Sequence, residues 1–548
     1  MDSHTHRELI LGPPGTGKTT TLMGVIKALL EEGYAPDQIG FVSYSKASVG
    51  EALDRVVRET GIDARRWPWF RTLHSCYSKI QRLPKDVYLC AEDLKRISKY
   101  SITERDESSD DGYDVPSRHQ DDEQKRDDEI RSAMDWCRSR MVPMHHGIDR
   151  LTYATGSRYT DFVRDYHSML KEIGKFDHTS ILESALRNRV TIPVRVLIVD
   201  EAQDLSPLQA ACVEVTFPSC DRVYVAGDDD QAIYEFQGSS PDWLIDLSRR
   251  EDWTTRVLGQ SWRCPEPVRA RAEKIARRMA NRAEKPYAAR DGGGVYRVGV
   301  AKGDALDAVS SAAGSVMVLC RSRKYCTQWG SALRSASVPY IIERGGSSPF
   351  GANGLRGAID LMMQIYNSHE VEIGRLQWLA NSPWAPSATK KRAGVFDHGG
   401  KARIKSVAQA NPKRTVDPTW PEDIADFGLS PIIGSDPWSL LSSITVWPDK
   451  AGDVRRDLAT LRRVWDSCGG SWPESMPIVT TWHASKGREA DLVVIDPSLP
   501  QPCLKALWSA RTRDPEHRVA YVALTRARHT ALITEPDPGA RGEYPFPA

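Results

Sequence analysis

Near its N-terminus the sequence reads Gly12-Pro13-Pro14-Gly15-Thr16-Gly17-Lys18-Thr19, which fits the pattern GxxxxGK[ST]. An apolar run at residues 9–11 precedes this stretch, and residues 19–30 follow it with a helical pattern. A strand, a glycine-rich loop and a helix in this order let backbone N–H groups curl around phosphate oxygens. The stretch therefore predicts a nucleotide-binding α/β fold; an ordinary glycine-rich turn is the alternative.

The residue types of this loop suit a triphosphate and its metal ion. Lys18 would place a positive charge on the β- and γ-phosphates, and the Thr19 hydroxyl would bind Mg²⁺. The nucleotide contacts expected here come from Gly12, Pro13, Pro14, Gly15, Thr16, Gly17, Lys18, Thr19 and Thr20.

A second motif narrows the class of nucleotide-binding protein. Residues 194–199 are apolar and lead directly into Asp200-Glu201-Ala202-Gln203-Asp204. A carboxylate at the end of a buried strand suits the magnesium shell, so we expect Asp200 there. Glu201 would orient and deprotonate the attacking water. The alternative is a polar turn that simply follows a strand.

Length, net charge, cysteine pattern and apolar segments further limit the class of protein. At 548 residues the chain has room for roughly two to four domains. A formal net charge of +1 means that contact with nucleic acid must come from local patches. The ten cysteines form no CxxC pair, which predicts neither a zinc site nor a disulfide framework. Because the N-terminus has no signal-like apolar segment and no run is long enough to span a membrane, we expect a soluble, cytoplasmic protein.

Further apolar runs at residues 39–43, 223–226, 316–319 and 492–495 predict buried strands of parallel sheets. Two regions interrupt this pattern. Residues 84–185 read as mostly helical, with an acidic, serine-rich stretch at 104–129 that predicts a solvated or disordered loop. Residues 350–475 hold a basic segment, which indicates either a solvated surface or a duplex-binding accessory domain. Its basic residues are Lys390, Lys391, Arg392, Lys401, Arg403 and Lys405.

The stretch Gly227-Asp228-Asp229-Asp230-Gln231-Ala232-Ile233-Tyr234 resembles the third motif of UvrD/Rep/PcrA-type superfamily 1 DNA helicases. Asp200-Glu201-Ala202-Gln203-Asp204 is similar to their second motif. The other motifs follow in order over nearly the whole chain, at Tyr44-Ser45-Lys46-Ala47, Thr72-Leu73-His74-Ser75, Gln260-Ser261-Trp262-Arg263, residues 481–489 and residues 521–528.

This resemblance implies an α/β fold with two RecA-like parallel-sheet motor domains, each with a mostly helical inserted subdomain. The first motor domain would comprise residues 1–83 and 186–255, with the helical insertion at 84–185. The second would comprise residues 256–349 and 476–535, with the accessory insertion at 350–475. Residues 536–548, rich in Pro and Gly, would form a disordered tail.

The resemblance also implies an ATP- and Mg²⁺-dependent DNA helicase that moves 3′ to 5′ on single-stranded DNA and unwinds duplexes. Catalytic roles would fall to Lys18, Glu201, Gln231, Arg263 and Arg526. Additional nucleotide contacts would come from Trp262, Gly487 and Glu489, with the Trp262 indole stacking on the base. DNA contacts would come from Tyr44, Thr72, His74, Tyr234, Phe236 and His483. Taken singly, such arginines are also compatible with surface salt bridges, and such aromatics with core packing.

Other functions remain open at the level of sequence. The chain could be a translocase that strips proteins from single strands or assists recombination, or a degenerate or RNA-directed motor. The short leader before Glu8 shows no counterpart of the family's adenine-reading glutamine motif, and Gln237 stands where an arginine is common. Expected partners are single-stranded and forked DNA with repair or replication proteins, but no membrane, and the protein would be a monomer or weak dimer.

Overall fold

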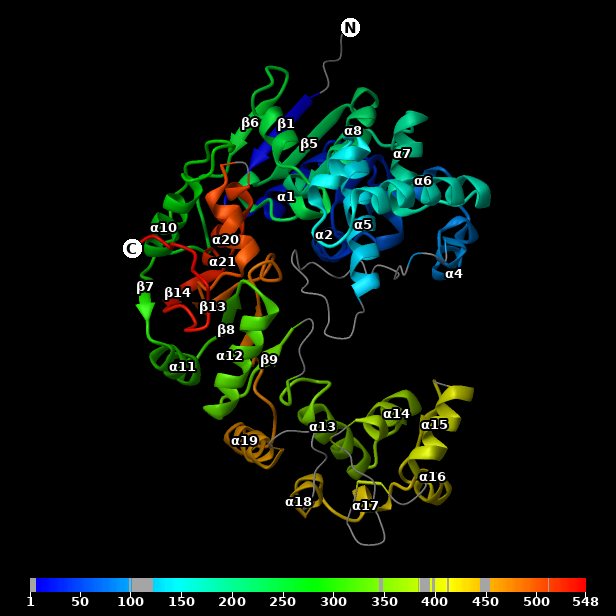
Figure 1. Cartoon of the computed structure of the whole chain (residues 1–548), viewed down its shortest axis with the longest axis vertical. Helices are drawn as coiled ribbons and strands as arrows, with labels where there is room; N and C mark the ends of the chain where they lie inside the picture. The colour runs from blue at the N-terminus through cyan, green and yellow to red at the C-terminus, as the bar shows by residue number, and fades with distance from the viewer. Residues whose placement is uncertain are drawn as a thin grey trace. The chain divides into compact units, whose positions relative to one another are not determined.

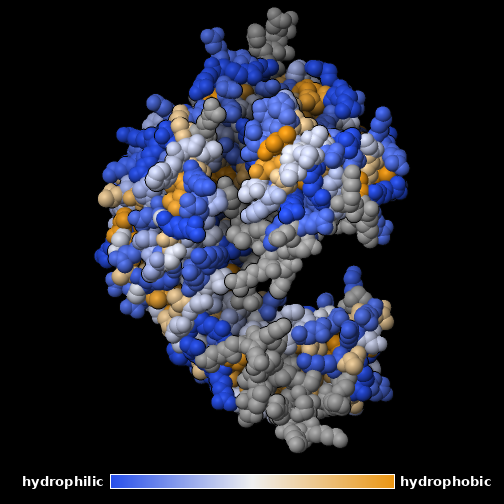
Figure 2. Space-filling model, in the orientation of Figure 1, coloured by the Kyte–Doolittle hydropathy of each residue, from blue (hydrophilic) through white to orange (hydrophobic). Residues whose placement is uncertain are grey.

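The computed structural model describes residues 6–97, 100, 122–343, 348–382, 384, 395–396, 400–411, 413–443, 454–510 and 512–548. The chain divides into two compact units, residues 1–299 with 482–548, and residues 300–481. Figure 1 labels many of their helices and strands, and Figure 2 shows hydrophilic side chains over most of the visible face, with small apolar patches between them. Among the described residues, no helix has the length and apolar character needed to cross a membrane.

The first unit contains a six-stranded sheet in the order β3-β2-β4-β5-β1-β6. Its neighbouring strands pair in parallel. Their bounds are β1 (His6–Leu11), β2 (Ile39–Ser43), β3 (Phe70–Thr72), β4 (Val196–Asp200), β5 (Arg222–Gly227) and β6 (Thr254–Val257). Residues of β2 and β4 are buried throughout, as expected for a parallel sheet covered on both faces.

Helices cover both faces of this sheet. Apolar side chains of α1 (Lys18–Glu31) and α2 (Lys46–Thr60) form a core with one face. The other face packs against α3 (Leu73–Ile80), α7 (His178–Arg187), α8 (Pro207–Thr216) and α9 (Asp242–Leu247). The start of α8 is fixed locally by Ser206, which exchanges capping hydrogen bonds with Gln209, and by Pro207 at the first helical position.

The region between β3 and β4 is mostly helical where it is described, as predicted. It contains α4 (Ala91–Leu94), α5 (Asp122–Ser139) and α6 (Gly156–Ile173). The acidic stretch 104–129 was expected to be a solvated or disordered loop. Residues 104–121 lie outside the described residues, but residues 122–129 form the start of α5, so the expectation is wrong there. Asp127 is buried and ion-paired with Arg158, which explains why this acidic sequence is part of a packed helix.

The first unit also contains α10 (Glu266–Ala276), β13 (Ala490–Ile495), α20 (Gln501–Trp508), α21 (Arg513–Leu524), β14 (Ala527–Thr534) and all of β7 (Val295–Val300) except its last residue. β13 and β14 pair in parallel, and α20 and α21 connect them. The tail, residues 536–548, was expected to be disordered but is packed. Tyr544 is buried, and its ring and that of Phe546 both meet the Trp482 indole edge-on. The packing of these aromatic side chains orders the tail despite the Pro- and Gly-rich composition that suggested disorder.

The second unit begins with α11 (Lys302–Ser311), β8 (Val316–Cys320), α12 (Arg323–Ser335) and β9 (Ile341–Ile342), and β12 (Ile478–Thr481) closes it. β12 pairs in parallel with β8 and with β9. Between β9 and β12 lie α13 (Leu355–Tyr366), β10 (Val371–Glu372), α14 (Ile373–Asn381), α15 (Gly400–Ala410), β11 (Thr415–Val416), α16 (Pro421–Phe427), α17 (Ser430–Ile433), α18 (Pro437–Ser443) and α19 (Val454–Ser467).

The predicted fold class is confirmed, because the described strands form two six-stranded sheets and one two-stranded sheet, β10-β11, with helical insertions. The predicted domain boundaries remain a prediction. The two compact units do not coincide with them, because the expected second motor domain is divided between the units. In the basic segment of the accessory insertion, Lys390, Lys391 and Arg392 lie outside the described residues. Lys401, Arg403 and Lys405 lie on α15.

Candidate nucleotide site and DNA-facing cluster

The glycine-rich loop lies between β1 and α1, as predicted. Gly17 caps α1 with φ 82°, a left-handed conformation that suits glycine. Inside the loop, the Thr16 hydroxyl donates to the Pro13 carbonyl at 2.8 Å. The Lys18 ammonium group folds back and donates to the Gly12 carbonyl, also at 2.8 Å. The predicted phosphate-binding residues therefore share one compact loop at the carboxyl end of β1.

The segment Ser261–Arg263, from far along the chain, packs directly against this loop. The Trp262 amide donates to the Gly15 carbonyl at 2.8 Å, and the Ser261 hydroxyl donates to the Pro14 carbonyl at 2.8 Å. Gly15 has φ 70°, and a Cβ added there would lie 2.4 Å from Cβ of Arg263, so this close approach requires glycine. The Trp262 side chain is 73% exposed and so keeps an indole face available for stacking.

Asp200 and Glu201 stand at the end of β4. Burial and the neighbouring Glu201 charge raise the pKa of Asp200 to about 7, although Lys18 opposes the shift. Burial alone would also raise the pKa of Glu201, but the charges of Lys18 and Lys486 lower it below its ordinary value. Asp200 is thus short of positive charge, and a divalent cation would supply that charge. Its carboxylate and the hydroxyl of Thr19, the second residue of α1, are oxygen donors of the kind that Mg²⁺ prefers.

Gln231 and Arg526 meet although 295 positions separate them in the chain. Nη2 of Arg526 donates to Oε1 of Gln231 at 2.9 Å, and Nε2 of Gln231 donates to Asp228 at 2.7 Å. The other hydrogen bonds of Arg526 go to the carbonyls of Val522 and Arg488 and to the Thr525 hydroxyl. Burial and the charge of Arg263 lower the pKa of Arg526. Because these acceptors are neutral, they do not neutralise the guanidinium charge, and the group can bind an anion.

The remaining predicted nucleotide contacts have other partners in this structure. Glu489, expected at the ribose, forms ion pairs with Arg263 and Arg528. The Thr20 hydroxyl accepts a hydrogen bond from Arg55 at 3.1 Å. Gly487 has φ 79°, which fits a tight turn before β13. Glu489 is thus paired with Arg263, whose segment lies against the glycine-rich loop.

Four of the six predicted DNA-contacting residues form one aromatic cluster: Tyr44, Tyr234, Phe236 and His483. The Tyr44 and Tyr234 rings stack with centroids 5.5 Å apart. Phe236 lies 6.3 Å from Tyr234 and meets the His483 ring edge-on at 5.7 Å. The Tyr44 hydroxyl donates to Gln237 at 2.6 Å, so the unusual glutamine orders this cluster.

The other two predicted DNA contacts make local structural interactions. The Thr72 hydroxyl accepts from the Ser75 amide and caps α3. The His74 ring meets the His178 ring edge-on, with centroids 5.4 Å apart. Neither observation assigns or removes a DNA role, which stays a prediction for both residues.

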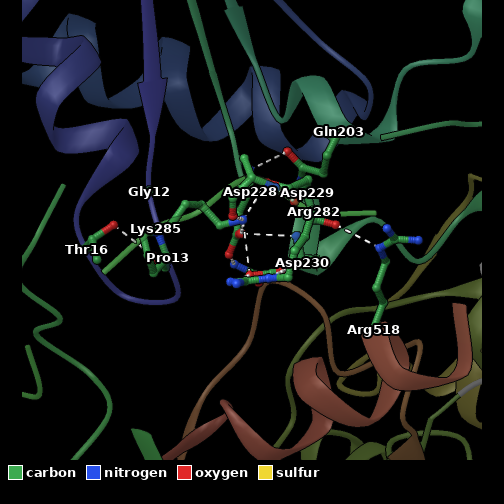
Figure 3. A network of polar contacts seen from close by, with 12 residues as sticks. Gly12, Pro13, Thr16, Gln203, Asp228, Asp229, Asp230, Arg282, Lys285 and Arg518 are labelled. Carbon is green, nitrogen blue, oxygen red and sulfur yellow. Dashed lines mark hydrogen bonds and ion pairs between the residues drawn. The ribbon is translucent and has the colours of Figure 1, made fainter. Parts of the chain in front are cut away.

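A buried charge network next to Gln231 was not predicted. Asp228, Asp229 and Asp230 are all buried, and Lys285 pairs with all three. Arg282 binds Asp230 through two hydrogen bonds, and Arg518 donates to the Asp229 carbonyl (Figure 3). Three consecutive aspartates directly after a buried strand signal that cations must lie nearby. The sequence does not tell which of the chain's 74 lysines and arginines supply them.

Comparisons with known proteins bear on the family resemblance of the chain. Residues 2–251 match the family model of the UvrD/REP helicase N-terminal domain. The ATP-dependent DNA helicase UvrD2 of Mycobacterium tuberculosis is 24% identical over 95% of this chain and 76% of its own length. The ATP-dependent DNA helicase UvrD1 of the same organism is 26% identical over 53% of this chain and 40% of its own length. The resemblance to UvrD/Rep-type superfamily 1 helicases is therefore confirmed.

Proposed function

We propose that this chain is an ATP-dependent DNA helicase that moves 3′ to 5′ on single-stranded DNA and separates duplex strands. The observation that carries the proposal is the 2.9 Å hydrogen bond between Arg526 and Gln231. It joins the last motif of the sequence to the third, within the same unit as the glycine-rich loop. Similarity to the UvrD-type helicases supports the ATP dependence and the DNA substrate.

In this proposal the triphosphate binds to the glycine-rich loop. The loop amides and Lys18 would hold the β- and γ-phosphates, while Thr19 and Asp200 would hold Mg²⁺. The metal ion would neutralise phosphate charge. Glu201, which Lys18 and Lys486 keep ionised, would orient the attacking water and accept its proton.

Arginines from later in the chain would complete the site. Arg526, buried and bonded to neutral oxygens, would stabilise negative charge on the transferring phosphoryl group. Arg263 would act beside it, since its segment lies against the loop at Gly15. The exposed indole of Trp262 would stack on the base.

A direct connection joins this site to the aromatic cluster. The Lys486 ammonium group donates to the Gln231 backbone carbonyl at 2.9 Å and pairs with Asp204. The same group lies 5.0 Å from the centroid of the Tyr234 ring. A movement of Gln231 during hydrolysis would thus alter the position of Tyr234, three residues later. At Tyr234 the aromatic faces would hold bases.

The proposal is tested by strand separation with duplexes that carry either a 3′ or a 5′ single-stranded tail. The 3′-tailed duplex should be unwound in the presence of ATP and Mg²⁺, and the 5′-tailed duplex should not. Removal of a tightly bound protein from single strands, measured in parallel, separates a helicase from a translocase. Protein displacement without unwinding would favour the translocase, and preference for the 5′ tail would contradict the polarity.

A further inference from the structure

The turn that precedes Gln231 buries three carboxylates in succession. Asp228, Asp229 and Asp230 follow β5, and each side chain is at most 1% exposed. Carboxylates this close together repel one another and are costly to bury unless cations compensate them. The turn therefore depends on its cationic partners.

Lys285 is the central partner of this turn. Its buried Nζ lies 3.4 Å from Asp228, 2.5 Å from Asp229 and 3.1 Å from Asp230 (Figure 3). Its own segment is fastened to the same turn, because the Ala283 amide donates to Asp229 at 2.9 Å. Arg282 binds only Asp230 among the three carboxylates, so Asp228 relies on Lys285 for an ion pair.

Asp228 determines how the Gln231 amide is oriented. Oδ2 of Asp228 accepts from Nε2 of Gln231 at 2.7 Å, which leaves Oε1 of Gln231 to accept from Arg526 at 2.9 Å. A carboxylate only accepts hydrogen bonds and a guanidinium only donates them, so the amide fits in one orientation. If Asp228 took up a proton, it could donate, and the amide would no longer be fixed.

We propose that Lys285 is a positioning residue for ATP hydrolysis: it keeps Asp228 ionised, and Asp228 in turn holds Gln231 against Arg526. The inference rests on the proposed function and adds to it a residue from outside the motifs. Lys285 lies between α10 and β7 and is directed toward the acidic turn, where it would not contact the nucleotide itself. Burial raises the pKa of Asp228 and Lys285 opposes that shift, in agreement with this role.

The decisive variant is Lys285→Met, which keeps most of the side-chain volume and removes the charge. We expect kcat of DNA-stimulated ATP hydrolysis to fall by roughly tenfold or more, because small misplacements of catalytic groups are costly. KM for ATP should change by less than about threefold, since the glycine-rich loop is not altered. Lys274→Met is the matched control, since Lys274 is exposed on α10 and lies outside the network.

Charge-balanced rescue separates this role from a loss of folding. Lys285→Met combined with Asp229→Asn removes one positive and one negative charge, so the turn keeps its original net charge. This double variant should recover most of the lost kcat, and it decides the question if Lys285→Met alone does not fold. Wild-type kcat in folded Lys285→Met, or a folded double variant below about a tenth of the wild-type rate, would overturn the inference. Absence of ATP hydrolysis by the wild-type protein would instead contradict the proposed function.

Discussion

The nucleotide site and the aromatic cluster lie in the same unit but are built from different interactions. The first gathers charged groups, including Lys18, Asp200, Glu201 and Arg526, and burial and neighbouring charges shift the pKa values of the last three. The second contains rings whose centroids lie 5.5 to 6.3 Å apart, together with the hydrogen bond from Tyr44 to Gln237. Charged groups in a buried site interact strongly with one another, whereas each stacked ring contributes on its own. Substitutions in the nucleotide site should therefore reduce ATP hydrolysis far more than substitutions in the aromatic cluster reduce DNA affinity.

The largest effect is expected for Lys18→Ala. Loss of the ammonium group should abolish ATP binding and reduce hydrolysis on the order of a thousandfold, while single-stranded DNA still binds. Nucleotide titration and steady-state ATPase rates measure this effect. Lys27→Ala on the same helix, where Lys27 pairs with Glu59 at 2.8 Å, is the matched control. DNA-stimulated hydrolysis at the wild-type rate in Lys18→Ala would contradict the assignment of the loop.

A nearly equal loss of hydrolysis is expected for Glu201→Gln, but with a different signature. The amide cannot accept the water's proton, so kcat should fall by about 10²- to 10⁴-fold while ATP still binds. Equilibrium nucleotide binding and single-turnover hydrolysis distinguish this variant from Lys18→Ala. Glu214→Gln on α8 is the control, since Glu214 bonds to Trp243 and Arg250 instead. Loss of ATP binding in Glu201→Gln would argue against its role as the base.

In the aromatic cluster, Phe236→Ala should weaken single-stranded DNA binding by about 1–3 kcal/mol, the contribution of one stacked base. ATP hydrolysis without DNA should stay unchanged. Fluorescence anisotropy with a labelled oligonucleotide measures the affinity. Tyr153→Ala, which removes a 60% exposed aromatic side chain from the helical insertion, is the comparison. An equal loss in both variants would show that Phe236 is not a specific platform.

The smallest effect is expected for Tyr44→Phe, which keeps the stacked ring and removes only its hydroxyl. The bond to Gln237 is lost, so DNA affinity should fall by about 0.5–1.5 kcal/mol, less than for Phe236→Ala. The same anisotropy titration measures it, and Tyr44→Ala reports the added loss of the ring. A larger effect for the hydroxyl than for the ring would reverse our view that stacking dominates this cluster.

Much of the architecture follows from local sequence pattern. The predicted strand at residues 39–43 coincides with β2, and the predicted strand at 194–199 overlaps β4, which ends at Asp200. Short apolar runs between helices determine such strands, because both faces of a parallel sheet are buried. The approach of Arg263 to the loop and of Arg526 to Gln231 was anticipated only through the ordered set of family motifs.

Other features depend on contacts that local pattern does not contain. Lys285 and Arg282 lie in an undistinguished stretch, and their significance comes from aspartates more than fifty positions earlier. The tail composition predicted disorder, yet Tyr544 packs against Trp482 from a distant motif. Asp127 reads as part of a solvated acidic run until its ion pair with Arg158 is known. In each case a long-range partner decides the structure.

The central claim is that Arg526 acts on the nucleotide held by Lys18, and single-turnover ATP hydrolysis by Arg526→Ala tests it most directly. We predict that ATP binds to this variant with nearly wild-type affinity but is hydrolysed at least about a hundredfold more slowly, with or without DNA. Hydrolysis at the wild-type rate by the folded variant would contradict the claim.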